Sequence, residues 1–297
     1  MHIAAHNWMR AEPIRRTVER LHAHGISALE IAGEPEQYDT REVRALLRDH
    51  GLSCWGAVTL TLGERNLAAR DAAQREATVD YMKRVVTMVK ELDGQIVSLV
   101  PLTVGKVVPD ATPEEEWRWV VEGVKAVYEH AQRAGVRIAI EPLNRFETYL
   151  INRTDQALAL ADAVGPDCGV CLDVFHMNIE EADLHAAFRQ ARGRIHDVHL
   201  ADSNRFALGM GHLDFGAILS TLREVGYEGA LSLEFVATLD RTPANPYGAQ
   251  AETRPVDISP QQKQFIIDHG SNLLSDEFYT SLFARSMDVL RPLMARG

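Results

Sequence analysis

Short apolar runs alternate with amphipathic stretches along almost the whole chain. The apolar runs lie at 2–7, 26–31, 53–60, 95–100, 136–141, 168–173, 195–200 and 230–236. Between them, the spacing of apolar positions predicts helices near 13–24, 39–50, 70–91, 113–134, 154–164, 180–192 and 214–225. This alternation is typical of parallel strands joined by crossover helices. We therefore predict an α/β protein of the (β/α)8 TIM-barrel class.

Capping residues support these boundaries. Thr112 stands before Pro113 and a run of glutamates, which is the pattern of a helix N-terminus. Gly25, Gly51 and Gly135 each follow a helical stretch and precede an apolar run, as C-terminal caps do. The same join from helix to strand is thus predicted at three places.

The alternation ends after the last apolar run. Residues 237–259 are rich in Pro and polar residues, and an amphipathic helix is predicted over roughly 276–294. A barrel needs roughly 250 residues, so we expect one domain over 1–297 with 237–275 as an insertion. Connections this long are usually functional or disordered. The insertion is expected to be a lid over the barrel mouth or a subunit contact, with a plain surface loop as the alternative.

Charge and composition exclude several classes of partner. The chain has 31 Lys and Arg against 42 Asp and Glu, a formal net charge of −11. This balance disfavours binding to nucleic acid or to an anionic membrane and favours a small, largely neutral substrate. The 3 Cys argue against a disulfide framework. No stretch has the length of a membrane span or the pattern of a signal peptide, so we expect a soluble cytoplasmic protein.

Four polar residues follow or end the last predicted strands. These are Glu141, Asp173, His199 and Glu234, separated by 32, 26 and 35 residues. One βα unit of a barrel takes roughly 31 residues, so the four recur about once per unit. Because catalytic groups of TIM barrels lie at the carboxyl ends of the strands, we expect these side chains to converge.

Converging carboxylates repel one another unless a cation compensates their charge. Three carboxylates and one imidazole form an oxygen-rich ligand set, which suits Mn²⁺, with Mg²⁺ or Co²⁺ as alternatives. Zinc more often takes histidines or thiolates. For any one of these residues taken singly, a helix cap or a surface strand end is the favoured interpretation, but four in register predict a metal site made by Glu141, Asp173, His199 and Glu234.

The residues around these positions resemble a known family. The segments are Glu-Pro-Leu-Asn-Arg-Phe-Glu at 141–147, Leu-Asp-Val-Phe-His-Met-Asn at 172–178, His-Leu-Ala-Asp-Ser-Asn-Arg at 199–205 and Leu-Glu-Phe at 233–235. They are similar to those of the ketose 3-epimerases, which include D-tagatose and D-allulose 3-epimerases. That family belongs to the xylose isomerase-like sugar isomerase and epimerase superfamily. The resemblance covers most of the chain and is strongest over 136–236.

The resemblance implies roles for individual residues. The metal ligands of the family correspond to Glu141, Asp173, His199 and Glu234. The two catalytic carboxylates of the family correspond to Glu141 and Glu234. Positions that hold the substrate's hydroxyl and carbonyl-side oxygens correspond to Glu147, His176 and Arg205. It also implies a homo-oligomer.

The implied reaction explains why these residue types are needed. A proton beside a ketone is too weakly acidic for a carboxylate alone, and a metal ion stabilises the enediolate as a Lewis acid. Arg205 and His176 add positive charge or hydrogen bonds at the developing oxyanion. One glutamate then removes the proton, and the other returns a proton to the opposite face. We therefore expect a metal-dependent epimerase or isomerase of a ketose or related keto-sugar.

Residues near other strand ends are further candidates. His6 and Trp8 follow the first run and are expected to line the pocket and contact substrate, although Trp8 is equally typical of a core. Glu30 is a candidate for a substrate hydroxyl or for a structural role. Because His196 and His199 lie three apart in a strand, only one is expected to face the site, and we choose His199.

Other functions remain open. The insertion 237–275 is longer than the family's usual segment, and the ends of the first two strands differ from those of typical epimerases. Catalytic subunits of C-glycoside deglycosidases have a similar metal site, act as lyases on 3-oxo-glycosides, and work with a small second subunit. A DNA-repair endonuclease is disfavoured by the net charge, and a sugar-binding scaffold with an unused site is the non-enzymatic alternative.

Overall fold

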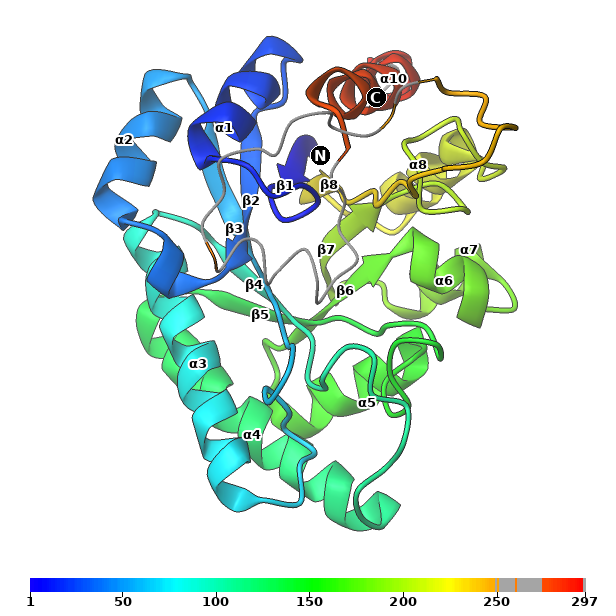
Figure 1. Ribbon diagram of the computed structural model, residues 1–297. Coiled ribbons are helices and arrows are strands. Elements are labelled where there is room, and N and C mark those ends of the chain that lie inside the picture. Colours follow the sequence, from blue (N-terminus) through cyan, green and yellow to red (C-terminus); the bar gives the residue numbers. More distant parts are fainter. Residues whose placement is uncertain (249, 251–259, 261–273, 296–297) are drawn as a thin grey trace.

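The computed structural model describes residues 1–248, 250, 260 and 274–295. Its eight parallel strands form one closed barrel in the order β1 to β8 (Figure 1). The strands are β1 His2–His6, β2 Ala28–Gly33, β3 Ser53–Thr59, β4 Ile96–Leu99, β5 Arg137–Ile140, β6 Gly169–Asp173, β7 Ile195–Leu200 and β8 Ala230–Leu233. Every predicted strand is present, and the predicted xylose isomerase-like barrel is confirmed.

Helices surround this barrel. They are α1 Ile14–Ala23, α2 Thr40–Asp49, α3 Ala72–Glu91, α4 Pro113–Ala134, α5 Thr154–Val164, α6 Val174–Glu180, α7 Leu184–Gln190, α8 Phe215–Glu224 and α10 Asp276–Met294, with a short 3-10 helix, η1, at Pro35–Gln37. Thr112 caps α4 with a reciprocal bond to Glu115, and Gly135 ends α4 in the left-handed conformation at φ 71°. Both capping predictions are therefore confirmed.

One helix prediction was wrong in its bounds. The stretch 180–192 is not a single helix, because α6 ends at Glu180 and α7 spans Leu184–Gln190. Helix α6 was not predicted at all. It begins directly after β6 because the Asp173 carboxylate accepts a hydrogen bond from the Phe175 amide at 2.8 Å, which caps the helix.

Alternate residues of each strand face the barrel interior and form two layers. The lower layer is a buried apolar cluster of Ala4, Ala28, Trp55, Ile96, Ala139, Cys171 and Ala230. The upper layer is polar. Its residues lie two positions after a residue of the lower layer in most of these strands: His6, Glu30, Ser98, Glu141, Asp173 and Ser232. The apolar layer thus closes the barrel beneath a polar layer at the carboxyl ends of the strands.

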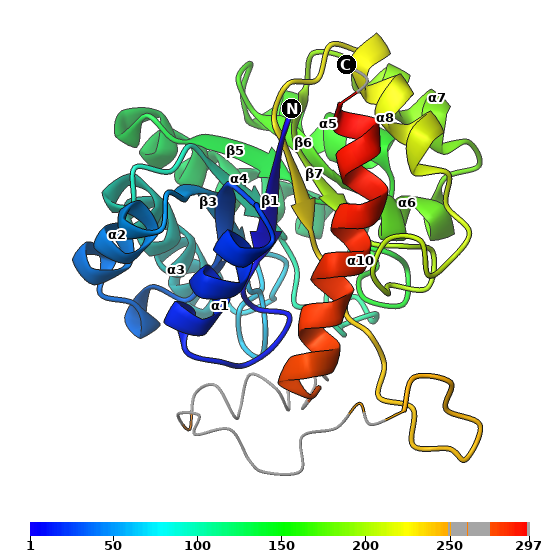
Figure 2. The same cartoon turned by 90° about the horizontal axis from the view of Figure 1, so that it is seen from above.

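Helix α10 closes the ring of helices between α8 and α1 (Figure 2). Its N-terminus is held by a set of charges that we call the anchor cluster: the buried Arg10, Glu12 and Arg20 and the partly exposed Asp276. Arg10 contacts Glu12 at 2.6 Å, and Arg20 bonds both Glu12 and, at 2.6 Å, Asp276. The guanidinium of Arg20 also lies 4.7 Å from the ring centre of Tyr279. These contacts fix α10 against the loop between β1 and α1.

Most of the predicted insertion 237–275 lies outside the described residues. In its described part, the Asn245 side chain bonds the backbone of Asp240 and Gly248 at 3.0 Å, which closes a turn. The ring of Tyr247 packs against Phe206 and Phe278. The roles predicted for the insertion, lid or subunit contact, therefore stay predictions. No helix among the described residues is long and apolar enough to cross a membrane.

Candidate active site

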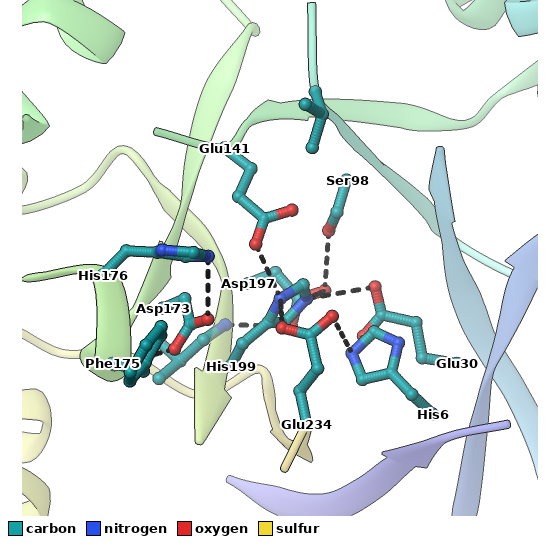
Figure 3. A network of polar contacts seen from close by, with 12 residues as sticks. His6, Glu30, Ser98, Glu141, Asp173, Phe175, His176, Asp197, His199 and Glu234 are labelled. Atoms are coloured by element: carbon teal, nitrogen blue, oxygen red, sulfur yellow. Dashed lines mark hydrogen bonds and ion pairs between the residues drawn. The ribbon is translucent and has the colours of Figure 1, made fainter. Parts of the chain in front are cut away.

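The four predicted metal ligands lie at the carboxyl ends of neighbouring strands. Glu141 directly follows β5, Asp173 ends β6, His199 lies in β7 and Glu234 directly follows β8. All four are buried. His199 is central: its Nδ1 is 3.1 Å from Glu141 Oε1 and 3.2 Å from Glu234 Oε2. Figure 3 shows the two glutamates approaching His199 from opposite sides.

Asp173 joins this group through Glu141. Ligand atoms of Glu141, Asp173 and His176 lie within 4.8 Å of one another. The Oδ2 atom of Asp173 is 3.4 Å from His176 Nε2, and neither atom makes a hydrogen bond within the protein. Among the described residues, His199, Glu234 and His6 form another such group, and none of the groups contains all four predicted ligands.

A further pair of carboxylates lies on the other side of the His199 ring. Its Nε2 is 3.2 Å from Glu30 Oε1 and 3.8 Å from Asp197 Oδ2. Asp197 accepts a hydrogen bond from Ser98 at 3.1 Å. The imidazole is thus held at Nε2 by Glu30, which leaves Nδ1 directed at Glu141 and Glu234. Contacts of this kind fix the ring orientation of histidines, including those that bind metals.

Burial and charge shift the pKa values of the cluster in different directions. Burial, with the neighbouring Glu234, raises the pKa of Asp173 well above its usual range, and burial also raises that of Glu141. Burial opposes ionisation of Glu234, but His199 and His6 hold its pKa well below its usual value. For His199, burial opposes the charge, yet Cys171 and the carboxylates raise the pKa. The raised pKa values of Asp173 and Glu141 show that the protein alone does not compensate the charge of all these carboxylates at once.

The donor set fits a divalent cation. Three buried carboxylates and one imidazole share a small volume, and Asp173 Oδ2 and Glu234 Oε2 lack a hydrogen-bond partner in the protein. Buried carboxylate oxygens are costly without a partner, and hard cations prefer such oxygens. The residues thus match the ligand set predicted for Mn²⁺, Mg²⁺ or Co²⁺.

A cavity of about 510 Å³ opens beside the cluster. Trp8, Glu147 and Arg205 line it together with Glu141 and Glu234. The Trp8 indole N–H donates to Glu234 Oε1 at 3.0 Å, and Arg205 donates to Glu147 at 2.9 Å. His6 and His176 do not line the cavity. His6 Nε2 instead lies 3.4 Å from Glu30, and burial lowers the pKa of His6 to about 3.

Arg205 has a strained backbone. Its φ is +59°, in the left-handed region that residues other than Gly rarely adopt. Hydrogen bonds of its backbone to Asp202 at 2.8 Å and to Val236 at 2.7 Å hold this conformation. The guanidinium then lies 4.8 Å from the ring centre of Phe175 and 3.9 Å from Glu234. Strain of this kind is concentrated at functional sites, where it positions a side chain.

The structure adds residues that the sequence analysis missed or left open. Asp197 was not predicted, and Glu30 was predicted only as a substrate or structural residue. Asn144 was missed as well: its amide group bonds Glu147 at 2.9 Å and His176 Nδ1 at 2.8 Å. Inward alternation along β2 and β7 was the available signal for Glu30 and Asp197. His196 lies away from the cluster, 3.3 Å from the Ile138 carbonyl, so the choice of His199 agrees with the geometry.

Comparisons with known proteins identify the family of the chain. Residues 18–253 match the family described as "Xylose isomerase-like TIM barrel". An L-ribulose 3-epimerase of Mesorhizobium japonicum is 33% identical over 224 residues, covering 74% of this chain and 75% of the relative. A D-psicose 3-epimerase of Agrobacterium fabrum is 31% identical over 235 residues, covering 74% of this chain and 79% of the relative.

A solved structure shows the same fold over the whole chain. It is described as "Structure of L-ribulose 3-epimerase" and superposes with a TM-score of 0.83, at 24% identity, covering 100% of this chain and 95% of the other. At this identity the likeness concerns the fold alone. With the family match and the two relatives, the chain belongs to the ketose 3-epimerase family of xylose isomerase-like TIM-barrel enzymes.

Proposed function

We propose that this protein is a divalent-metal-dependent epimerase of a ketose or related keto-sugar. The observation that carries the proposal is the placement of Glu141 and Glu234 on two sides of His199, at the wall of the cavity. Epimerisation needs a proton removed from one face of a carbon and another delivered to its opposite face. Two carboxylates facing each other across the same space suit that requirement.

A cation held by Glu141, Asp173, His199 and Glu234 would act as a Lewis acid beside the substrate carbonyl. The protein positions its own groups for the proton transfers. One of Glu141 and Glu234 removes the proton, and the other returns a proton to the opposite face. The Trp8 indole N–H donates to Glu234 Oε1, which favours the ionised form, so we assign Glu234 as the base in one direction and Glu141 as the acid. The two roles exchange when the reaction runs backwards.

Substrate oxygens are assigned to the groups around the glutamates. Arg205 lies 3.9 Å from Glu234 and supplies a fixed positive charge where the oxyanion develops. Glu147 accepts hydrogen bonds from Arg205 and Asn144, and we assign it a further hydrogen bond from a substrate hydroxyl. His176 does not line the cavity; Asn144 bonds its Nδ1, and its Nε2 lies 3.4 Å from Asp173 Oδ2, where it supports that carboxylate. His6 supports Glu234 from 3.8 Å.

The other parts of the assignment stay predictions. The relatives named above are epimerases, whereas cleavage of a 3-oxo-glycoside by a lyase differs only in the fate of the same enediolate. A small partner subunit belongs to the lyase alternative, and a homo-oligomer to the epimerase. The identity of the cation, with Mn²⁺ first and Mg²⁺ or Co²⁺ next, is part of the proposal.

Exchange of carbon-bound hydrogen for deuterium tests the proposal. Metal-stripped protein is incubated in D₂O with D-psicose, D-tagatose or L-ribulose, with and without Mn²⁺, and the carbon positions are followed by NMR. We expect exchange beside the carbonyl, and formation of the 3-epimer, only after Mn²⁺ is added. Mg²⁺ and Co²⁺ are compared at equal concentration.

Two results would contradict parts of this proposal. If exchange in the presence of a strong chelator equals exchange with Mn²⁺, the cation has no role in the reaction. Exchange without epimer formation, accompanied by loss of a substituent, would favour the lyase instead.

A further inference from the structure

A second cavity, of about 430 Å³, lies at the other end of the barrel from the candidate active site. Among its lining residues, Gln95 precedes β4, Arg137 begins β5, Ile195 begins β7 and Gly229 precedes β8. Trp55, which belongs to the lower apolar layer of the barrel interior, lines it as well. The cavity therefore lies at the amino-terminal ends of the strands, beneath the apolar layer.

The guanidinium of Arg137 has no hydrogen bond or ion pair within the part of the chain that the structure describes. Arg137 is partly buried, and its guanidinium carbon lies 5.7 Å from the ring centre of Trp55. Every other buried or partly buried arginine of the described chain donates to a carboxylate or carbonyl oxygen. Arg194, for example, donates to Asp162 and to the Cys168 carbonyl, each at 2.6 Å. The unused donors of Arg137 thus distinguish it from the arginines that serve the fold.

The charge of Arg137 is also uncompensated within the described chain. Arg137 is the only Lys or Arg among the residues that line this cavity. Burial, together with the neighbouring Arg137, lowers the pKa of His196, so this ring is neutral at pH 7. Glu228 lines the cavity too, but it is exposed and forms no ion pair with Arg137. The cavity therefore presents one fixed positive charge with free N–H donors.

The chemistry of the lining indicates the class of ligand. A guanidinium presents a planar fork of donors that matches two oxygens of a carboxylate or a phosphate. The Trp55 ring supports this cation without taking up its N–H donors. The exposed residues Gln95 and Glu228 add acceptors for hydroxyl groups. A volume of about 430 Å³ lies in the range of ~300–1,000 Å³ that is typical of small-molecule sites.

We infer that this cavity binds a small hydroxylated oxyanion, whose phosphate or carboxylate group lies on the guanidinium of Arg137. A phosphate ester and a sugar acid present the same pair of oxygens to the guanidinium. A neutral sugar lacks the group that Arg137 binds, so this ligand differs from the substrate proposed for the carboxyl ends of the strands. The inference is therefore independent of the proposed function.

Calorimetric titration of the metal-free full chain tests the inference. The probes are D-glucose 6-phosphate and D-gluconate, with D-glucose as their neutral counterpart. We expect at least one anion to bind with a dissociation constant below about 1 mM, and D-glucose to bind at least about tenfold more weakly. The anion that binds more tightly identifies the source of the oxyanion. NMR resonances of the Gly193, Gly226 and Gly229 amides, which line the cavity, are expected to shift during the titration.

Variants locate the bound anion. Arg137→Gln removes a charge that has no hydrogen bond in the described chain, so the fold is expected to persist while anion affinity falls at least about tenfold. Arg137→Lys keeps the charge without the fork and is expected to bind with intermediate affinity. Arg133→Gln is the matched control, because Arg133 is an exposed residue of α4 that does not line the cavity. Arg205→Gln is a second control, because Arg205 lines the other cavity. Both controls are expected to retain the anion affinity.

The outcomes decide the inference in either direction. It is overturned if neither anion binds more tightly than D-glucose, or if the three glycine amides do not shift. It is also overturned if anion affinity is lost in Arg205→Gln and kept in Arg137→Gln, because the anion then lies at the candidate active site. Circular dichroism and urea midpoints show whether Arg137→Gln is folded. If it is not, an anion affinity of Arg137→Lys equal to that of the unchanged protein would contradict the role of the guanidinium.

Discussion

Two clusters of buried charge use similar residues for opposite purposes. In the anchor cluster, Arg10 and Arg20 meet Glu12, and Asp276 completes the set. In the candidate active site, Glu141 and Glu234 contact His199, Asp173 joins them through Glu141, and oxygens of Asp173 and Glu234 are left without hydrogen bonds. The first cluster satisfies its charges within the protein, and the second does not.

This difference separates a structural cluster from a binding cluster. A buried charge is tolerated when partners and hydrogen bonds compensate it, and removing one partner is then strongly destabilising. Thr17 adds a hydrogen bond to Glu12 at 2.8 Å, and Arg10 donates to the Leu274 carbonyl at 2.9 Å. A cluster with uncompensated carboxylates instead stabilises the protein only after a cation arrives. Four predictions test the contrast, from the largest effect to the smallest.

The largest effect is expected for Glu141→Gln. The amide cannot transfer the proton and is a poorer ligand, so kcat for epimerisation should fall on the order of 10³-fold. Removing one of several repelling buried carboxylates should not lower the free energy of unfolding of the metal-free protein. Epimer formation by NMR and urea denaturation measure both properties, with exposed Glu76→Gln as the control. Retained activity would contradict the role of Glu141.

Glu12→Gln should have the opposite profile. It leaves the buried guanidinium groups of Arg10 and Arg20 without their shared carboxylate, which is expected to cost about 3 kcal/mol of unfolding free energy. Urea denaturation of this variant is compared with that of Glu19→Gln, which changes an exposed residue of the adjacent helix α1. A loss no greater than in the control would show that the anchor cluster is dispensable.

Cation binding should stabilise the protein through the site cluster alone. Mn²⁺ at a hundred times its dissociation constant is expected to raise the free energy of unfolding by about 2.7 kcal/mol. Asp173→Asn should lose most of this gain, whereas exposed Asp80→Asn should keep it. Thermal unfolding with and without Mn²⁺ measures the difference. An undiminished gain in Asp173→Asn would exclude Asp173 as a ligand.

The smallest effect concerns pH and the anchor cluster. Burial opposes ionisation of Asp276, but its bonds to Arg16 and Arg20 lower its pKa. A lowered folded-state pKa stabilises the protein above the unfolded value of about 3.9, and this contribution is lost as pH falls through the folded-state pKa. Asp276→Asn should therefore cost about 1 kcal/mol or less at pH 7 and nothing at pH below the folded-state value. Urea midpoints at pH 7 and pH 3 show whether the stabilities of the unchanged protein and of Asp276→Asn become equal at low pH.

Local patterns were sufficient for the barrel. Apolar spacing predicts every strand and most of the helices between them, and Thr112 and Gly135 mark the ends of α4. Helix α6 was missed because its capping residue, Asp173, was also the end of a strand and a candidate ligand. One side chain with two roles gives a sequence pattern that suggests only one of them.

Contacts between distant strands could not be predicted from the sequence. The pattern placed Glu141, Asp173, His199 and Glu234 at strand ends, since one residue per barrel unit is a local regularity. That Glu30 holds His199 at 3.2 Å depends on how β2 and β7 face each other across the closed barrel. Pairing of this kind joins residues 169 positions apart, and no local pattern encodes it.

The sequence by itself determined the fold and the chemical types at the carboxyl ends of the strands, because strand alternation and the length of a barrel unit are local properties. The tertiary structure decided which charges are compensated and which are not. It closed the anchor cluster and left oxygens of Asp173 and Glu234 without hydrogen bonds. Compensation of charge depends on distances between separate elements, which closure of the barrel fixes.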